Sequence, residues 1–140
     1  MLQLTKTDFI KFQNCPKSFW LERNKSEVYP HGKFSGYMKK LAQEGYEVEA
    51  HFKDLILTRP DHTRFQFQFE FTTADGLLAK ADAVRLNDDG TIDLFEVKSS
   101  TSVKKDAKHD QLKDAAFQKV VAAAAGYAVR TVTLVHLNGK

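Results

Sequence analysis

The chain has 140 residues, about the size of one domain, and two domains of half that length would each have a thin core. Its hydrophobic fraction of 42% and charged fraction of 28% are ordinary for a globular protein, and no apolar run reaches the roughly 18 residues that span a membrane. The N-terminus has no apolar stretch or cleavage site typical of a signal peptide, so we expect a single domain over residues 1–140, cytoplasmic and without a membrane partner.

The net charge and the cysteine content limit the kinds of binding site that the chain could carry. The net charge of +3 is compatible with a polyanionic partner but is weak evidence for one. Cys15 is the only cysteine, so the chain forms no internal disulfide and offers no cysteine cage for zinc or an iron–sulfur cluster. A bound metal would therefore be held mainly by oxygen atoms.

Residues 1–60 are expected to be helical. Thr5, with Asp8 three residues later, indicates an N-cap with an acidic first turn, and Pro16 is well placed to begin a second short helix. Apolar residues recur at helical spacing from 36 to 57 without an intervening proline. This segment predicts the longest helix of the N-terminal part.

Residues 64–137 are expected to contain a sheet. The segment from Arg64 to Phe71 alternates phenylalanines with polar residues, which predicts a strand with one buried aromatic face. A base-stacking platform is the alternative interpretation of these rings. Turn residues separate further strands over Leu77–Leu86 and Thr91–Ser99, so the three strands form an antiparallel meander.

A helix and a last strand complete the order. Asp110 to Ala125 is rich in helix formers and ends at Gly126, and Val129 to Leu137 is β-branched and apolar, which predicts a buried strand. The predicted fold class is α/β, with a mixed central sheet flanked by helices.

The turn over Asn87–Gly90 predicts a register. Centred near residue 89, it aligns Leu86 with Ile92, Val84 with Leu94, Asp82 with Glu96, and Lys80 with Lys98. Two carboxylates, Asp82 and Glu96, would then face each other.

Opposed carboxylates destabilise a hairpin unless a cation compensates, and Mg²⁺ suits a small number of carboxylates with water and phosphate oxygens. Lys98, on the same face as Glu96, would lie beside such a cation, where it could orient the attacking water or stabilise a phosphate. An ordinary surface ion-pair cluster is the alternative. The apolar run from Ile92 to Val97 favours a covered central strand instead.

These residues resemble a known family. Asp82, the segment Leu-Phe-Glu-Val-Lys-Ser-Ser-Thr over residues 94–101, and the helix and strand after it are similar to the PD-(D/E)XK nuclease superfamily, in its RecB-like and CRISPR-adaptation-nuclease branch. Residues 4–9 and 15–21 are similar to the N-terminal helices of that branch, so the likeness spans most of the chain. An uncharacterised bacterial family with a Glu-Val-Lys-Ser-Ser-Thr segment and a later Ala-Phe-Gln, here residues 116–118, is closer still.

The resemblance implies a restriction-endonuclease-like core and roles for particular residues. Asp82 and Glu96 would be metal ligands, Lys98 the catalytic lysine, and Gln118 the helix residue that reaches toward the site and the substrate backbone.

A third ligand is less constrained. Members of this branch usually carry a His or Glu on the helix before the meander, often four residues after a glycine, and Gly45 is followed at that spacing by Glu49. We prefer Glu49 to the neighbouring Glu44, Glu47 and His51, each of which could equally lie on a solvated helix face.

Other reactive residues receive no site role. Iron–sulfur members of the branch add three C-terminal cysteines to an early one, and those three are missing here, so we expect Cys15 to pack between two helices. Neither His109 nor His136 is assigned a function. Lysines at positions 98, 104, 105, 108 and 113 could follow a phosphate backbone, although a solvated loop explains them nearly as well.

The sequence thus predicts a nuclease dependent on Mg²⁺ or Mn²⁺, with DNA as its partner, in which a metal-activated water attacks a phosphodiester bond. One alternative is a catalytically inactive nucleic-acid-binding module with a nuclease fold. Another is the nuclease portion of a larger assembly.

We predict that the purified protein binds no iron–sulfur cluster, because one cysteine cannot hold it. Anaerobically purified protein should be colourless and free of stoichiometric iron by metal analysis. Brown protein with visible charge-transfer absorbance would contradict this expectation.

Overall fold

The computed structural model describes residues 2–29, 36–106 and 110–139. Lys108 and His109, named above, lie outside the described residues. Within these ranges no helix is long and apolar enough to cross a membrane.

The N-terminal part consists of a short strand and three helices: β1 (Leu4–Thr5), α1 (Lys6–Asn14), α2 (Pro16–Asn24) and α3 (Gly36–Leu57). The predicted caps are confirmed. Thr5 and Asp8 form a reciprocal capping box at α1, and Pro16 occupies the first turn of α2.

Cys15 corrects one expectation, because it is exposed rather than packed between helices. Its sulfur lies 3.4 Å from the backbone nitrogen of Ser18 and accepts a hydrogen bond there, so the residue serves as the N-cap of α2. The short link between α1 and α2 holds the thiol at a helix end instead of between the helix faces.

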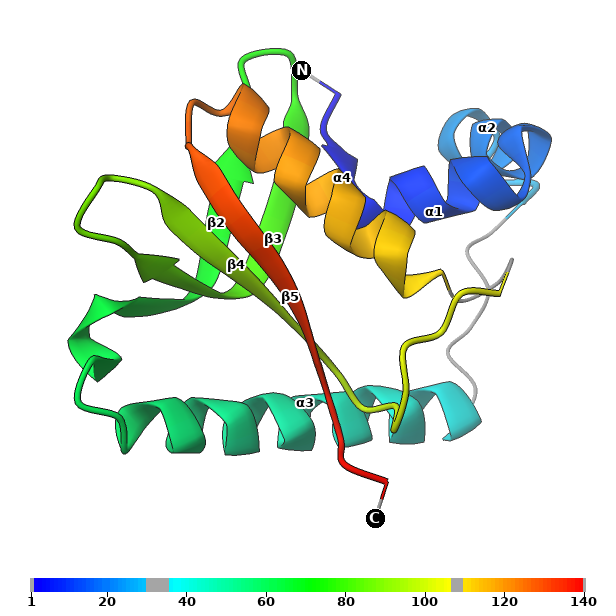
Figure 1. The fold of residues 1–140 in the computed structure, drawn as a ribbon. Helices are drawn as coiled ribbons and strands as arrows, with labels where there is room; N and C mark the ends of the chain where they lie inside the picture. Colours follow the sequence, from blue (N-terminus) through cyan, green and yellow to red (C-terminus); the bar gives the residue numbers. More distant parts are fainter. Residues whose placement is uncertain (1, 30–35, 107–109, 140) are drawn as a thin grey trace.

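The second part contains the sheet strands β2 (Phe65–Thr72), β3 (Leu77–Leu86), β4 (Ile92–Lys98) and β5 (Val129–His136), with α4 (Gln111–Ala124) before β5 and a 3₁₀ turn over His62–Arg64 before β2. β2, β3 and β4 form the predicted antiparallel meander, and β5 pairs parallel to β4. The fold is therefore α/β with a mixed central sheet, as predicted, and helices flank the sheet (Figure 1).

The predicted register of the β3–β4 hairpin is confirmed where the strands pair. Leu86 lies opposite Ile92 and Val84 opposite Leu94, and the pairing ends with Ala83 opposite Phe95.

The extended register also aligned Asp82 with Glu96 and Lys80 with Lys98, and neither pair is part of the ladder between β3 and β4. The strands separate before that point, and Lys80 pairs with Glu70 on the other side, across to β2.

The four phenylalanines of β2 do not share one face, which corrects the prediction from their alternation. Phe65 and Phe67 pack on the side of α3, whereas Phe69 and Phe71 belong to the cluster on the side of α4. The cause is Gln68, whose φ of 53° interrupts the extended backbone and exchanges the two faces of the strand. A period-two pattern in sequence carries no sign of such an interruption.

The same interruption affects β3. The ladder pairs Phe67 with Ala83 and Phe69 with Ala81, and it omits the pair between them, Gln68 and Asp82. Ala81 accordingly belongs to the α4 side and Ala83 to the α3 side. Asp82 thus lies where the sheet changes its faces.

Two apolar clusters result, one on each side of the sheet. Figure 1 shows α4 and α1 on one side and α3 crossing the other. The larger cluster joins the sheet to α4, and its buried members are Phe71, Ala79, Ala81, Val84, Ile92, Leu94, Val121 and Ala122. The smaller cluster places Ile56 and Phe52 of α3 against Phe65, Phe67, Ala83 and Phe95.

β4 is the covered central strand that its apolar run predicted, since it pairs with β3 on one edge and β5 on the other.

β5 differs from the prediction of a buried strand. It pairs with β4 alone among the described strands, and its residues are half-buried or exposed. Its β-branched residues cover part of one edge of the sheet rather than a core position.

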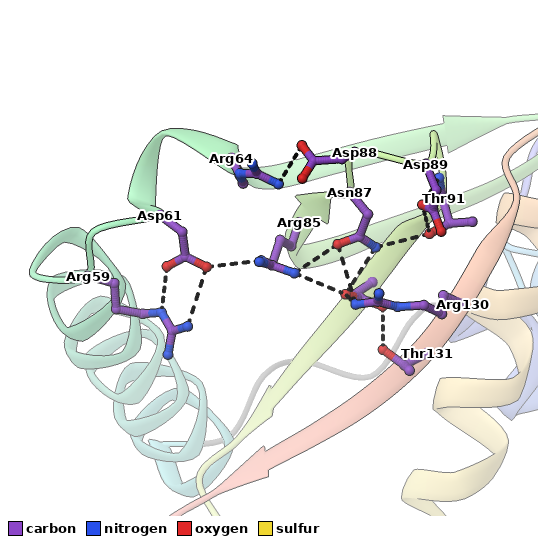
Figure 2. A network of polar contacts seen from close by, with 11 residues as sticks. Arg59, Asp61, Arg64, Arg85, Asn87, Asp88, Asp89, Thr91, Arg130 and Thr131 are labelled. Atoms are coloured by element: carbon purple, nitrogen blue, oxygen red, sulfur yellow. Dashed lines mark hydrogen bonds and ion pairs between the residues drawn. The ribbon is translucent and has the colours of Figure 1, made fainter.

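A polar network ties the hairpin end of the sheet to β5 (Figure 2). Its centre is Asp93, 4% exposed, whose carboxylate accepts hydrogen bonds from Arg130 at 2.5 and 3.0 Å and from the Thr131 hydroxyl at 2.7 Å. Arg85 extends the network to Asp61 at 3.0 Å. Burial alone would raise the pKa of Asp93, but Arg130 and the other donors outweigh it and lower this pKa to about 2.

We predict that Asp93→Ala destabilises the fold by about 2 kcal/mol, because it leaves Arg130 and Thr131 without their acceptor. Urea unfolding at neutral pH measures the change. Asp88→Ala is the matched control, since Asp88 pairs with Arg64 at 2.8 Å but its side chain is 86% exposed. Equal effects of the two substitutions would contradict the assignment.

Candidate functional site

The candidate site lies at a gap in the pairing along one edge of β3. β4 pairs with β3 over Ala83–Leu86, and β1 pairs with the other end of β3 at Leu77 and Leu78. No described strand pairs with residues 79–82 on that edge. The end of β4 and the start of α1, which follows β1 directly, therefore meet at this gap.

Asp82 faces the gap and takes over part of the missing pairing. The backbone N–H of Val97 donates to the Oδ2 of Asp82 at 2.6 Å, in place of a bond to a strand carbonyl. This contact fixes the carboxylate of Asp82 beside Glu96, the residue before Val97. A hydrogen bond from the backbone of Val97 thus holds Asp82 near Glu96.

Glu96 is 2% exposed, and protein donors occupy both of its carboxylate oxygens. Its Oε1 accepts from the ammonium groups of Lys98 at 2.8 Å and Lys6 at 2.5 Å. Its Oε2 accepts from the Nε2 of Gln118. Three elements, α1, β4 and α4, therefore converge on one buried carboxylate.

Gln118 is fully buried, and its side chain reaches the site by donating to Glu96. Its Oε1 is buried without a hydrogen-bond partner among the described residues. An unpaired buried acceptor beside a cluster of charges is unusual in folded proteins.

Asp114 was not singled out from the sequence. It lies one turn before Gln118 on α4, and its Oδ2 accepts from the ammonium of Lys98 at 2.9 Å. The spacing of four residues on one helix face was the available signal. Asp114 and Gln118 together fix the two site residues at the end of β4, Lys98 and Glu96.

Lys6 was also missed, because a lysine after a helix cap has no distinctive pattern. Its position follows from β1, where Leu4 pairs with Leu77 and its N–H donates to the carbonyl of Gly76 at 2.9 Å. This pairing sets the start of α1 next to the gap, and the first helical residue reaches Glu96.

Glu49 approaches the site from α3. The Nε2 of Gln68, the residue at the interrupted strand position, donates to its Oε2 at 3.1 Å. Of the alternatives, Glu47 accepts from Gln43 on the same helix, and His51 is exposed. Glu44 pairs with Lys40 at 3.9 Å and also lines the cavity beside Lys98.

The carboxylates repel one another. Burial and the charge of Glu96 raise the pKa of Asp82 to about 7, and the same two causes raise the pKa of Glu49. Burial would raise the pKa of Glu96 as well, but Lys6 and Lys98 outweigh it and keep this pKa below its usual value. The negative charge of the site thus rests first on Glu96.

Lys98 remains cationic. Burial alone would lower its pKa, but the carboxylates of Glu96 and Asp114 outweigh burial and raise the pKa above its ordinary value. Its ammonium can therefore donate hydrogen bonds and stabilise negative charge at neutral pH, but it cannot accept a proton in this arrangement.

The chemistry of the donors suits a hard divalent cation, since Glu49, Asp82 and Glu96 supply carboxylate oxygens and Asp82 titrates abnormally. Their present geometry does not form a ready cage. No group of three or more His, Cys, Asp or Glu side chains in the described part of the chain is arranged to hold a metal ion. The ammonium groups of Lys6 and Lys98 supply the positive charge at Glu96 instead.

A cavity of about 570 Å³ opens beside Lys98. Residues of α1 and α3, such as Asn14 and Leu41, line one part of it. The other part is lined by the segment after β4 and by α4, and it includes Ser100, Lys104 and Lys113. The cavity therefore joins Lys98 to polar and basic residues, and the acidic side chains of Glu44, Asp110 and Asp114 line it as well.

Comparison with protein-family models finds no match, and no curated protein matches the chain. Among solved structures, the chain is similar to one described as "Crystal structure of SSO0001", with 15% identity and a TM-score of 0.57. The match covers 96% of this chain and 62% of that one, so the chain spans less than two thirds of that protein's length. At this identity the likeness concerns the fold alone.

We predict that Asp82→Asn stabilises the fold at pH 8 by about 1–2 kcal/mol, because ionising Asp82 beside Glu96 is unfavourable. The pKa of Asp82 in the folded protein, about 7, exceeds its ordinary value of 3.8. Ionisation of Asp82 therefore makes the protein progressively less stable as the pH rises from about 4 to 7. The advantage of the variant should therefore disappear below pH 4. Urea unfolding across this range measures it, with Asp88→Asn as the control for an exposed charge. A variant that is less stable than the parent at pH 8 would refute the prediction.

Proposed function

We propose that this chain is a metal-dependent deoxyribonuclease that hydrolyses DNA phosphodiester bonds. The observation that carries the proposal is the meeting of three carboxylates with a lysine: Asp82 and Glu96 lie at the gap in the sheet, and Glu49 is close enough to interact electrostatically with both. Lys98 contacts Glu96 directly. The motif residues and the α/β fold are those that the resemblance to PD-(D/E)XK nucleases implies.

Glu49, Asp82 and Glu96 would hold Mg²⁺ or Mn²⁺, and Gln118 and Asp114 would position the residues of β4. When bound, such a cation acts as a Lewis acid and lowers the pKa of water. Burial of Glu96 supports this role, because a carboxylate in a low-dielectric site interacts strongly with a cation.

Lys98 would stabilise charge on the reacting phosphate. Asp114 fixes its ammonium from α4, and the raised pKa keeps it protonated, so it would donate hydrogen bonds to phosphate oxygens as negative charge develops. The cavity beside it would receive the phosphate backbone, with Lys104 and Lys113 contributing sequence-independent attraction.

A nucleic-acid-binding module without catalysis is the second candidate. The observation that favours it is the pairing of Glu96 with two ammonium groups, which neutralises the carboxylate without a metal. In that case the lysines would serve DNA binding and the acidic residues would serve structure.

We predict that Lys98→Ala reduces DNA cleavage by at least about a hundredfold while metal affinity changes little, because Lys98 acts on the phosphate and is not a ligand. Asp82→Asn and Glu96→Gln should weaken metal binding itself, since each removes a charged oxygen donor. Cleavage of linear, circular and single-stranded DNA with Mg²⁺ or Mn²⁺, together with calorimetric metal titration, separates the two effects.

Lys11→Ala is a matched control on α1, because Lys11 pairs with Glu22 away from the site. If the parent protein binds DNA in a salt-dependent manner, but has no metal-dependent turnover and no metal binding that requires Asp82, the binding module replaces the nuclease.

A further inference from the structure

The segment that follows β4, residues 99–104 (yellow in Figure 1), forms part of the wall of the cavity beside Lys98. It belongs to no helix or strand, so its shape depends on hydrogen bonds to neighbouring elements. One such bond joins it to the end of β5, where the backbone N–H of Leu137 donates to the carbonyl of Ser100 at 3.0 Å. Three further bonds come from Gln111 at the start of α4.

Gln111 is 8% exposed and contacts this segment with both its side chain and its backbone. Its Nε2 donates to the Oγ of Ser100 at 3.0 Å, and its Oε1 accepts from the backbone N–H of Lys104 at 3.0 Å. Its own backbone N–H donates to the carbonyl of Lys104, also at 3.0 Å. One buried glutamine thus closes residues 100–104 into a loop and fixes both ends of it.

The acidic side chains that line the cavity are already engaged by the protein. Asp114 accepts from the ammonium of Lys98 at 2.9 Å, and the carboxylate of Glu44 lies 3.9 Å from the ammonium of Lys40. Asp110 caps α4 by accepting from two backbone N–H groups of the helix, at 3.1 and 3.2 Å. Their negative charge is therefore partly compensated before any ligand enters.

Lys104 and Lys113, which line the same cavity, are in a different situation. Both are exposed, and the structure shows no acidic partner for either ammonium group among the residues that it describes. Their positive charge is available to an anionic ligand, and a nucleic-acid backbone attracts such groups whatever its base sequence. The hydroxyl of Ser99, also at the cavity, is a further kind of donor that phosphate oxygens accept from.

We propose that residues 99–104 are a phosphate-binding loop and that Gln111 is the positioning residue that holds this loop beside Lys98. Lys104 then donates to the phosphodiester backbone of the strand whose reacting phosphate lies at Lys98. The inference rests on the proposed function in taking DNA as the ligand, but it requires neither a bound metal nor cleavage. Gln111 itself does not touch the DNA and acts through Lys104.

Fluorescence anisotropy with labelled single-stranded and duplex oligonucleotides, measured in EDTA at several salt concentrations, tests the loop on the full chain. Lys104→Met removes one phosphate contact, so it should weaken binding about threefold to tenfold and make the slope of log Kd against log salt concentration shallower by about one. Gln111→Met keeps the length of the side chain without its polar atoms. It should cause the same two changes, because the released loop no longer holds Lys104 in place.

A double variant distinguishes this positioning role from a general loss of stability. If Gln111 acts through Lys104, the protein that carries both substitutions should bind DNA no more weakly than Lys104→Met alone. Ser100→Ala removes only one bond of the loop, so it should cause a smaller loss of affinity and keeps the test open if Gln111→Met folds poorly. Lys119→Met is the matched control, because Lys119 is exposed on α4 outside the cavity and its loss should leave binding near that of the parent.

The outcomes separate this inference from the function on which it rests. Independent, multiplying effects of Gln111→Met and Lys104→Met would overturn the loop, and so would an unchanged salt dependence in either variant or a parent that binds neither oligonucleotide. Cleavage assays with Mg²⁺ or Mn²⁺ decide the nuclease separately. Salt-dependent binding that requires Lys104 and Gln111, without metal-dependent turnover, would support the loop and overturn the nuclease.

Discussion

A carboxylate buried as deeply as that of Glu96 must be neutralised, and this requirement organises the molecule around the end of β4. The positive charges come from elements far apart in sequence: Lys6 begins α1, and Lys98 ends β4 with support from Asp114 of α4. The N-terminal helices are thereby tied to the sheet by a contact across 90 positions of sequence. A substitution at Glu96 would leave the lysines facing one another, so the residue is structural whatever else it does.

The interrupted strands explain how one site can be reached from both sides of a sheet. The positive φ of Gln68 exchanges the faces of β2, and β3 changes its faces at the opposite residue, Asp82. Glu49 of α3 and Gln118 of α4 lie on opposite sides, yet both contact residues of this region. A regular sheet would have directed each strand residue to one side only, and the helices would have contacted separate sets of side chains.

Two acidic centres on neighbouring strands show opposite electrostatics. Asp93 is surrounded by donors, its pKa falls to about 2, and its ionised form stabilises the fold. Asp82 is surrounded by other carboxylates, its pKa rises to about 7, and its ionised form opposes folding. Strain of the second kind serves no structural purpose and is typical of functional sites, where stability is lower than the sequence could achieve. This contrast is consistent with the proposed site at Asp82, which rests on the meeting of Glu49, Asp82 and Glu96 with Lys98.

Local sequence patterns determined the fold class, the capping box of α1, the start of α2 at Pro16, the limits of α3, and the register of the β3–β4 hairpin where the strands pair. These features depend on contacts between residues near in sequence or on a turn that fixes alignment, so periodicity and cap residues suffice to predict them. The predicted nearness of Asp82 and Glu96 had the same origin.

Tertiary structure alone decided the rest. Three features depend on how the elements pack against one another, and the amino-acid sequence carries no local signal for that packing. They are the two faces of the phenylalanine strand, the half-exposed edge position of β5 and the exposed thiol of Cys15. The same holds for Lys6 and Asp114, since a lysine or aspartate on an amphipathic helix has the same local pattern whether it faces solvent or a buried charge. The sequence indicated Asp82, Glu96 and Lys98 as candidate residues, and long-range contacts decided which other side chains meet them, such as the pairing of β1 with β3 that places Lys6.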